Sequence, residues 1–390
     1  MDFRFTAEED AFRREVAEWL EANLPPGDSA RSMGEEDDEF FAFEAEMRKK
    51  LAAQGWLTTW WPVEYGGKGW SIWQQVVFNE EMAAHGVVGI GGHAVNTAGP
   101  SIIAHGTEEQ KRKHLPAICR GEGIYWLGFT EPNAGSDLAS LQMRADRDGD
   151  DYILNGSKLY IGDNREGDYL YAAVRTDPDL PKHQGISIFL VDLHSAGVSR
   201  QKLRRFGGGV KNQIFFDNVR APATDMVGEL NRGWSIVHTT LNLDRAGHGG
   251  HERALREWVD FARWTQETSH NGCRLWDEEA TQQRLVKSYM EIQHLRLLYW
   301  RVVSMRSKER PISYESSIFA LYRKMMGVRW SEAQNEIAGL YGQLKKGSKW
   351  APLDGRVEHA QRERLFTHGG GTPEIQKNII ATRGLGLPRG

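Results

Sequence analysis

The sequence predicts a multidomain α+β protein in which a helical block, an antiparallel β block and a second helical block follow one another. Apolar residues recur at helical spacing over 1–123, alternate between turn residues over 124–230, and return to helical spacing over 231–390. No β-α-β alternation is visible, which argues against a doubly wound fold. The chain has 390 residues, of which 40% are hydrophobic, enough for two or three domains.

The first block carries clear helix signals. Thr6 and Glu9 form a capping-box pattern, and apolar residues then follow at helical spacing until Pro25 and Pro26 stop the helix. Further elements are expected in this order: a helix over 35–54, a loop rich in glycine and tryptophan over 55–73, and a helix over 74–85.

Two dipeptides mark turns in the middle block. Asp148-Gly149 and Asn155-Gly156 each lie between alternating apolar runs, so we expect a β-hairpin at each. Other strands are expected over 169–175, 185–192 and 213–219. The last block predicts helices over 234–267, 278–306, 314–342 and 355–365, and a final helix after Gly371.

Composition excludes several classes of function. A net charge of −4 leaves no global basic surface for nucleic acid. Cys119 and Cys273 are isolated, which predicts a reducing compartment and neither a disulfide framework nor a metal site. We find no signal-peptide pattern and no apolar run that could span a bilayer, so a cytoplasmic protein is expected. We interpret His248 and His251 as packing or surface residues rather than metal ligands.

Residues 128–137, with the sequence Gly-Phe-Thr-Glu-Pro-Asn-Ala-Gly-Ser-Asp, are the most informative stretch of the chain. They follow the apolar run 124–127 and place turn-forming residues around a few small polar groups. Such a loop presents backbone N–H groups and hydroxyls at close range to a flat or anionic ligand.

The same stretch and four others, in order, resemble motifs of the acyl-CoA dehydrogenases. These segments are W-P-V-E-Y-G-G at 61–67, G-T-E-E-Q-K at 106–111 with L-P at 115–116, T-E-P-N-A-G-S-D at 130–137, Y-I-L-N-G-S-K at 152–158 and G-G-G-T-P-E-I-Q at 369–376. The resemblance covers essentially the whole chain. It implies an N-terminal helical domain (1–123), a middle β-domain (124–230) and a C-terminal four-helix domain (231–390).

The resemblance also implies FAD as cofactor and an acyl-CoA thioester as substrate. Backbone N–H groups of Leu127, Phe129 and Thr130, with the Thr130 hydroxyl, would meet the pyrimidine edge of the flavin. Ser136 and Arg245 match residues that contact CoA. Four further positions match residues that contact the cofactor: Tyr160, Gln282, Thr372 and Glu374. In the family, the residue that matches Gln282 reaches the cofactor across a subunit interface.

Three departures from the family pattern concern the cofactor. Tyr160 stands where the family usually has a tryptophan that stacks on the flavin, which keeps an aromatic face. Gly162 replaces a hydroxyl residue that bonds flavin N5. The family's R-x-x-F-G segment is absent, and the polar stretch 267–276 stands in its place, which leaves open how the FAD pyrophosphate is neutralised.

The residue expected to remove the α-proton of the thioester is also replaced. Many family members use the glutamate of E-G-T, but this chain has Gly370 there. A subset uses the glutamate of L-x-x-E-R on another helix, and the matching segment here is Leu-Asn-Leu-Asp-Arg at 241–245. Asp244 is therefore the candidate base. Its ordinary pKa is about 3.9 against about 4.3 for glutamate, so its shorter reach matters more than its basicity.

Three interpretations follow from these residues. In the first, Asp244 abstracts the α-proton, flavin N5 accepts hydride and an electron-transfer flavoprotein reoxidises the flavin. In the second, the chain is a silent FAD-binding subunit of a hetero-oligomer. In the third, the fold catalyses a lyase or desulfinase reaction without net oxidation. The G-G-G-T form resembles members that act on bulky substrates such as steroid side chains, so the Gly370 position leaves room for a branched or cyclic acyl group in a homo- or hetero-oligomer.

Overall fold

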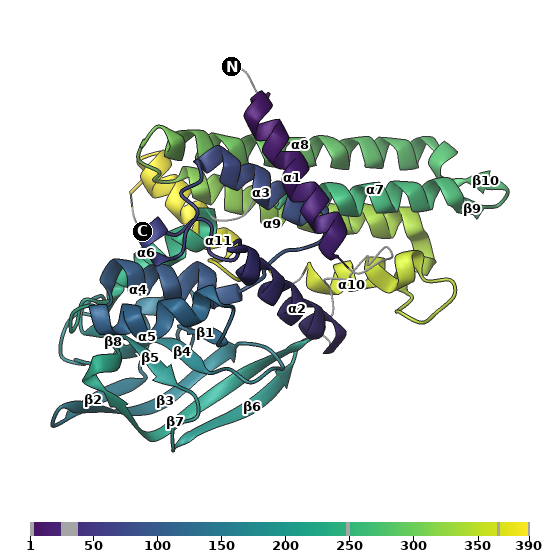
Figure 1. The fold of residues 1–390 in the computed structure, drawn as a ribbon. Helices are drawn as coiled ribbons and strands as arrows, with labels where there is room; N and C mark the ends of the chain where they lie inside the picture. The colour runs from purple at the N-terminus through teal and green to yellow at the C-terminus, as the bar shows by residue number, and fades with distance from the viewer. Residues whose placement is uncertain (1–3, 25–37, 247–249, 365–366, 389–390) are drawn as a thin grey trace.

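The computed structural model describes residues 4–24, 38–246, 250–364 and 367–388, and for 241–246 it describes the backbone alone. Helices form the upper layers and one large curved sheet lies beneath them (Figure 1). Three sequence predictions lie outside the described residues: the stop at Pro25 and Pro26, the first residues of the second helix, and His248. None of the described helices is long and apolar enough to cross a membrane.

The N-terminal helices begin where capping residues predict. Thr6, Ser71 and Thr107 each accept a hydrogen bond from the backbone three residues on, and each is part of a capping box. The predicted loop over 55–73 is confirmed up to Ser71. The helices of this block are α1 (Ala7–Asn23), α2 (Asp38–Gln54), α3 (Ile72–Ala84), the π-helical turn η2 (Ala94–Ala98), α4 (Gly99–His105) and α5 (Glu108–Cys119).

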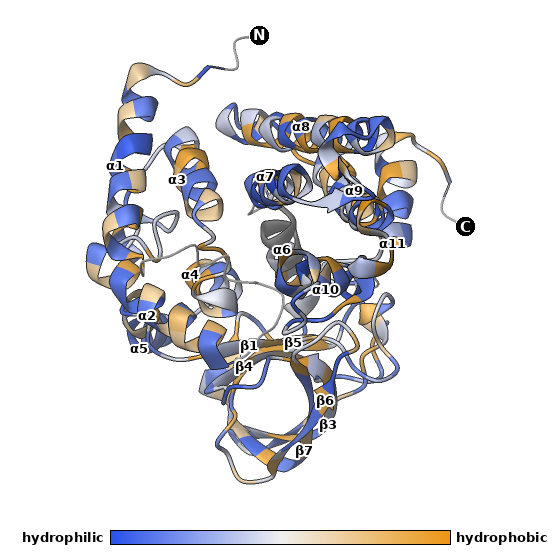
Figure 2. Ribbon diagram, turned by 90° about the vertical axis from the view of Figure 1, so that its right-hand side faces the viewer, coloured by the Kyte–Doolittle hydropathy of each residue, from blue (hydrophilic) through white to orange (hydrophobic). Residues whose placement is uncertain are grey.

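The middle block is a strongly curved sheet of eight strands, seen end-on in Figure 2. Its path runs β6-β7-β3-β2-β4-β5-β8, and β1 pairs with β4 in parallel, as does one residue pair of β2 and β4. The strands are β1 (Tyr125–Gly128), β2 (Arg144–Asp148), β3 (Asp151–Ile161), β4 (Tyr169–Arg175), β5 (Ile186–Asp192), β6 (Val198–Arg204), β7 (Val210–Pro222) and β8 (Met226–Val227). Polar β6 was not predicted because its sequence lacks an apolar run.

One predicted hairpin is confirmed and the other is wrong. The turn after Asp148 joins β2 to β3, but Asn155-Gly156 lies inside β3. There the pairing of β3 with β7 shifts register, and Gly156 has a φ of +139°. A Cβ at this position would lie 2.9 Å from the Cα of Met143, the residue before β2. The dipeptide therefore forms a β-bulge where two strands approach closely, which needs the same conformational freedom as a turn.

The last block is a bundle of helices packed on the first. Its predicted long helix over 234–267 is two helices, α6 (Gly233–Ala246) and α7 (His251–Glu267). A small hairpin of β9 (Ser269–His270) and β10 (Cys273–Arg274) follows, within the predicted polar insertion. The remaining helices are α8 (Glu279–Ser307), α9 (Glu315–Ala338), α10 (Arg356–Glu363) and α11 (Pro373–Ile379).

Strand β4 joins the two main cores. Leu170, Ala172 and Val174 are fully buried inside the curved sheet. Tyr171 and Ala173 are fully buried on the opposite face, against the N-terminal helices and α6. Because side chains alternate along a strand, β4 is covered on both faces, and it holds its parallel neighbour β1 between the sheet and the helices.

Candidate active site

The loop that follows β1 is shaped by its own hydrogen bonds. Glu131 and Ala134 exchange backbone hydrogen bonds of 2.9 and 3.2 Å, which close a tight turn. The carbonyl of Thr130 accepts a 2.8 Å hydrogen bond from the backbone N–H of Leu159. Thr130 is thereby placed beside Tyr160 on β3, so the structure brings these two predicted flavin contacts together. Ser136 is exposed at the far end of the loop.

A buried ion pair supports this loop from inside the sheet. The Nζ atom of Lys158, which has no exposed surface, lies 2.7 Å from Oε1 of Glu131 and donates to the carbonyl of Ala173 at 2.6 Å. The Glu131 carboxylate also accepts the backbone N–H groups of Gln142 and Met143 at 2.6 and 3.0 Å. Burial lowers the pKa of Lys158, and Glu131 opposes that shift. Both residues lie within motifs shared with the family, but no feature of the sequence indicates that they pair.

Tyr160 and Gly162 lie at the end of β3 in left-handed backbone conformations, with φ of +60° and +55°. The side chain of Tyr160 is 64% exposed and open to a stacking partner. A Cβ on Gly162 would lie 2.2 Å from the indole ring of Trp126, which is buried in β1. The missing hydroxyl at this position therefore follows from packing: Trp126 fills the space that a side chain would need.

The Gly-rich segment before α11 is a turn with left-handed Gly370 and Gly371, whose φ angles are +67° and +92°. Fully buried Gln376 donates to the carbonyl of Gly370 at 2.9 Å, while its own Oε1 has no hydrogen-bond partner in the described structure. Thr372 caps α11 by accepting the N–H of Ile375 at 3.2 Å. The pKa of the exposed Glu374 is lowered by hydrogen bonds from its own N–H and from Thr372.

Helix α6 carries the candidate base and packs between the sheet and the bundle (Figure 2). Thr240 of α6 is buried and lies 3.5 Å from the hydroxyl of Tyr171, which in turn contacts Ser101 of α4 at 2.5 Å. Position 244 follows Thr240 by one helical turn and therefore lies on the same side of α6. The side chains of Asp244 and Arg245 lie outside the described part of the structure.

Gln282 is not brought to this region within one chain. It is exposed on the first turn of α8, where it donates to the carbonyl of Trp276 at 3.1 Å. That turn adjoins the β9–β10 hairpin, at the opposite end of the bundle from α6 and α11 (Figure 1). The predicted contact across a subunit interface remains a prediction.

A cavity of about 480 Å³ lies between the Trp-rich loop, α3, η2 and the beginning of α7, and its lining combines aromatic and aliphatic side chains with the charged residues Glu80, Glu252, Arg253, Arg306 and Arg323. Trp56, Trp70 and Phe78 form one wall, with ring centroids 5.2 to 6.1 Å apart. We call it the aromatic cavity. It shares Arg253 and Arg323 with a second cavity.

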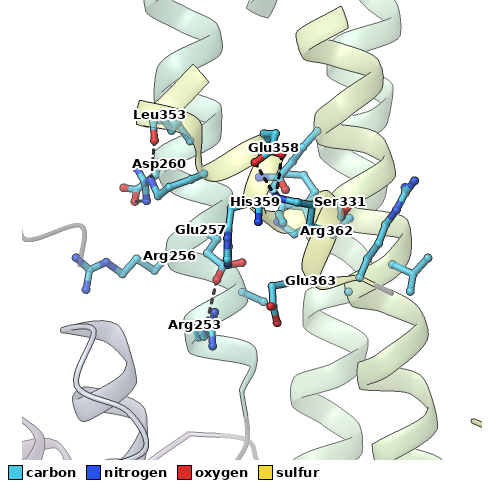
Figure 3. Close-up of a pocket in the computed structure, with 18 of the residues that line it drawn as sticks. Arg253, Arg256, Glu257, Asp260, Ser331, Leu353, Glu358, His359, Arg362 and Glu363 are labelled. Carbon is cyan, nitrogen blue, oxygen red and sulfur yellow. Dashed lines mark hydrogen bonds and ion pairs between the residues drawn. The ribbon is translucent and has the colours of Figure 1, made fainter. Parts of the chain in front are cut away.

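The second cavity, of about 420 Å³, lies among α7, α9 and α10 and is lined by many charged side chains (Figure 3). Its acids are paired: Glu257 with Arg253 at 2.9 Å, Asp260 with Arg356 and Glu358 with Arg362 both at 2.8 Å. Charged residues of α10 therefore line this cavity. Lys324 reaches from its wall to the carbonyl of Gly369 at 2.5 Å.

A buried charged cluster lies where α3 meets α7. Among the described residues, only Glu80, His251 and Glu252 bring three candidate metal-ligand atoms within 4.8 Å of one another. Arg13 already lies 2.7 Å from Oε2 of Glu80, and His251 contacts both carboxylates. Burial lowers the pKa of His251, but hydrogen bonds from its imidazole to the carboxylates of Glu252 and Glu80 outweigh it and raise the pKa overall. Arg13 also pairs with Glu81 at 2.6 Å, so each carboxylate of the cluster has a cationic partner, and we interpret the cluster as a structural charge network.

Models of three acyl-CoA dehydrogenase domains match the chain: the N-terminal domain over residues 6–122, the middle domain over 127–219 and the C-terminal domain over 231–385. The chain belongs to the acyl-CoA dehydrogenase family. It is an oxidoreductase of this flavoprotein family, and the helical, β and helical blocks are the fold of that family. The fold class predicted from the sequence is confirmed.

Several relatives cover the full length of the chain. It is 33% identical to acyl-CoA dehydrogenase FadE26 of Mycobacterium tuberculosis, with 100% of this chain and 99% of that protein covered. The solved Tcur3481-Tcur3483 steroid ACAD has a TM-score of 0.90 at 34% identity, with both chains covered fully. The ChsE4-ChsE5 complex from Mycobacterium tuberculosis has a TM-score of 0.89 at 32% identity, again with full coverage of both chains.

The residues present fit the flavin that the family carries. Exposed Tyr160 offers an aromatic face beside Thr130, and the turn at Gly370 and Gly371 has no side chains to block a ligand. The unpartnered Oε1 of Gln376 is a buried acceptor at the same turn, which a bound group would satisfy. These features come from the middle block and from α11, which no single sequence motif joins.

Proposed function

We propose that this protein catalyses FAD-dependent α,β-dehydrogenation of an acyl-CoA thioester, and that Asp244 takes the α-proton. One observation carries the proposal. The buried contacts from Phe129 to Tyr171, with ring centroids 5.8 Å apart, and from Tyr171 to Thr240 link the flavin-side loop to the side of α6 on which position 244 lies.

The other site residues have supporting roles in this proposal. Leu127, Phe129 and Thr130 would hold the flavin pyrimidine, Tyr160 would stack on the ring, and Gly162 would leave flavin N5 to backbone or water. Bound FAD would supply the acceptor for the hydride that leaves Cβ. Thr372 and Glu374 would hold the distal part of FAD, together with Gln282 of a neighbouring subunit. Ser136 and Arg245 would contact CoA.

The proposed base needs a dry position against the α-carbon, because desolvation raises the pKa of a carboxylate and so its strength as a base. Gly370 offers no carboxylate on the turn before α11, which leaves the α6 position as the proposed source of the proton acceptor. Gly370 would instead make room for a bulky acyl group. We further propose a homo- or hetero-oligomer and an electron-transfer flavoprotein as acceptor, by likeness to the solved two-chain complexes.

The decisive experiment replaces Asp244 with asparagine and, as the matched control, with glutamate. We expect Asp244→Asn to lower the rate of flavin reduction by about 10²–10⁴-fold, because general-base catalysis contributes about that much. Asp244→Glu should retain measurable reduction, since the carboxylate remains. The visible spectrum should show bound FAD in all three proteins. Unchanged flavin reduction in Asp244→Asn would refute the proposed base.

A further inference from the structure

We propose that the second cavity, among α7, α9 and α10, is a binding site for a small organic anion that carries carboxylate or phosphate groups (Figure 3). Trp330 and Ser331 of α9 would donate hydrogen bonds to this anion, and the surrounding arginines would balance its charge. The inference goes beyond the function proposed above, because it concerns neither the thioester nor the flavin.

The lining of the second cavity carries more positive than negative charge. Eight lysine and arginine side chains line it, against five aspartates and glutamates. Glu257, Asp260 and Glu358 each pair with an arginine of the same lining. A fourth acid, Glu363, lies 3.8 Å from Arg205, which is outside the lining. The excess of positive charge favours an anionic ligand.

Two neutral hydrogen-bond donors belong to the same lining. The residues Trp330 and Ser331 are only 4% and 3% exposed. Within the described part of the structure, neither the indole Nε1 of Trp330 nor the hydroxyl of Ser331 has a hydrogen-bond partner. Because an unpaired buried donor is costly, two of them beside a cavity indicate a ligand with acceptor atoms. Water would pair with these donors but would leave the positive charge unbalanced.

The size of the cavity and the type of its cations narrow the ligand class. Its volume of about 420 Å³ lies within the roughly 300–1,000 Å³ of pockets that enclose small organic ligands. Six of the eight cationic side chains are arginines. The planar guanidinium group matches the paired oxygens of a carboxylate or a phosphate. An organic anion with such groups therefore suits both the volume and the lining.

The proposed site lies next to the candidate active site but is separate from it. Among the described residues, none that we propose to contact the flavin or CoA lines the second cavity. Lys324 of the lining donates to the carbonyl of Gly369 at 2.5 Å, and Thr367 also belongs to the lining. A bound anion would therefore lie near the Gly-rich turn without occupying the predicted flavin contacts.

The test uses titration calorimetry on the purified holoprotein with three probes: citrate, fructose 1,6-bisphosphate and, as the uncharged control, glucose. In about 0.15 M KCl, at least one of the two anions should bind with a Kd of about 0.1 mM or lower. Citrate reports a preference for carboxylates and the bisphosphate a preference for phosphates. Glucose should give no heat of binding.

Two variants locate the binding. Trp330→Phe keeps an aromatic ring and removes the N–H, and Ser331→Ala removes only the hydroxyl. Each should weaken binding about ten-fold, because each removes one hydrogen bond to a charged group. Trp264→Phe, in the same helical core, and Ser317→Ala, on the same helix α9, are the matched controls. Neither control residue lines the cavity, so both variants should bind as the wild type does.

General attraction of an anion to basic side chains would not depend on these two neutral donors. If neither anion binds to the wild type, or if Trp330→Phe and Ser331→Ala bind as tightly as their controls, the inference is overturned. Ser331→Ala, the smaller change, decides the question if Trp330→Phe fails to fold. The titrations need neither acyl-CoA nor turnover, so a failure of flavin bleaching would refute the proposed dehydrogenation and leave this result unaffected.

Discussion

The flavin-side loop and the charged cluster where α3 meets α7, which we call the helix junction, both contain buried charges, but the paired residues are separated by very different distances along the chain. Lys158 and Glu131 are 27 residues apart and belong to one sheet. At the junction, Glu80 gathers Arg13 from α1, His251 from α7 and, at 3.1 Å, the indole N–H of Trp300 from α8, which is 220 residues away.

This difference separates what forms locally from what depends on assembly. The loop and its ion pair can form as soon as β1, β3 and β4 pair. The junction needs three helices from both ends of the chain to dock before its charges are balanced, because an unpaired buried charge is costly. The cofactor side is therefore fixed by the middle block, while the position of the proposed base depends on contacts between the two helical blocks.

The largest effect should come from Lys158→Met. Removing the ammonium leaves the Glu131 carboxylate buried without its cation, which typically costs about 3–5 kcal/mol. We expect the free energy of unfolding from urea titration to fall by about that amount, with loss of bound FAD. The double variant Lys158→Met/Glu131→Gln should recover part of the loss, because it removes the orphaned charge. A single variant as stable as the wild type would contradict a supporting role for the pair.

A smaller but still large loss is expected for Gly162→Thr. A threonine there would restore the family's hydroxyl, but its φ of +55° is unfavourable for a β-branched residue and its Cβ would overlap Trp126. Together, strain and overpacking should cost roughly 2–4 kcal/mol. Gly135→Ala is the control, since a Cβ there meets nothing within 4 Å. Thermal unfolding should show a clear drop for the first variant and little change for the second.

The sequence could predict the parts of the site that lie in consecutive residues. The loop at 128–137 and the cap at Thr372 are local, so their turn and capping chemistry is visible in the chain. The reason for Gly162 could not be predicted, because it lies in the packing of Trp126, 36 positions earlier. The hairpin predicted at Asn155-Gly156 is wrong because a β-bulge and a hairpin turn both require the backbone conformations that glycine adopts readily.

The same limit applies to the helical blocks. Periodicity predicted both ends of α8 and the beginning of α9 to within one residue, although α9 ends at Ala338 rather than at 342, because long amphipathic patterns are strong signals. Periodicity did not predict that the helix expected over 234–267 is two helices. It also did not predict that His251, which we expected to be a packing or surface residue, contacts the carboxylates of Glu80 and Glu252. Such contacts depend on which helix faces dock, and that information is spread over distant segments.

The smallest predicted effect is a difference in how stability depends on pH in the two regions, each of which contains a buried histidine. On the cofactor side, Nδ1 of His114 lies 2.7 Å from the hydroxyl of Tyr125 in β1, and burial lowers the His114 pKa to about 4. It stays neutral in the folded state while the unfolded chain takes up a proton near pH 6.5. Its contribution is therefore present above pH 6.5 and is lost as the pH falls toward 4, by about 2 kcal/mol after allowance for solvent screening.

His251 should behave in the opposite way. Its pKa is raised in the folded state, so its contribution is present below pH 6.5 and is lost as the pH rises through the folded value. The groups that face it are Glu80, Glu252 and Tyr299. Urea titrations from pH 4.5 to 9 should show that His114→Gln removes acid sensitivity and His251→Gln removes a loss at alkaline pH. If both variants changed the same limb of the profile, the two regions would share one electrostatic response and the contrast between them would fail.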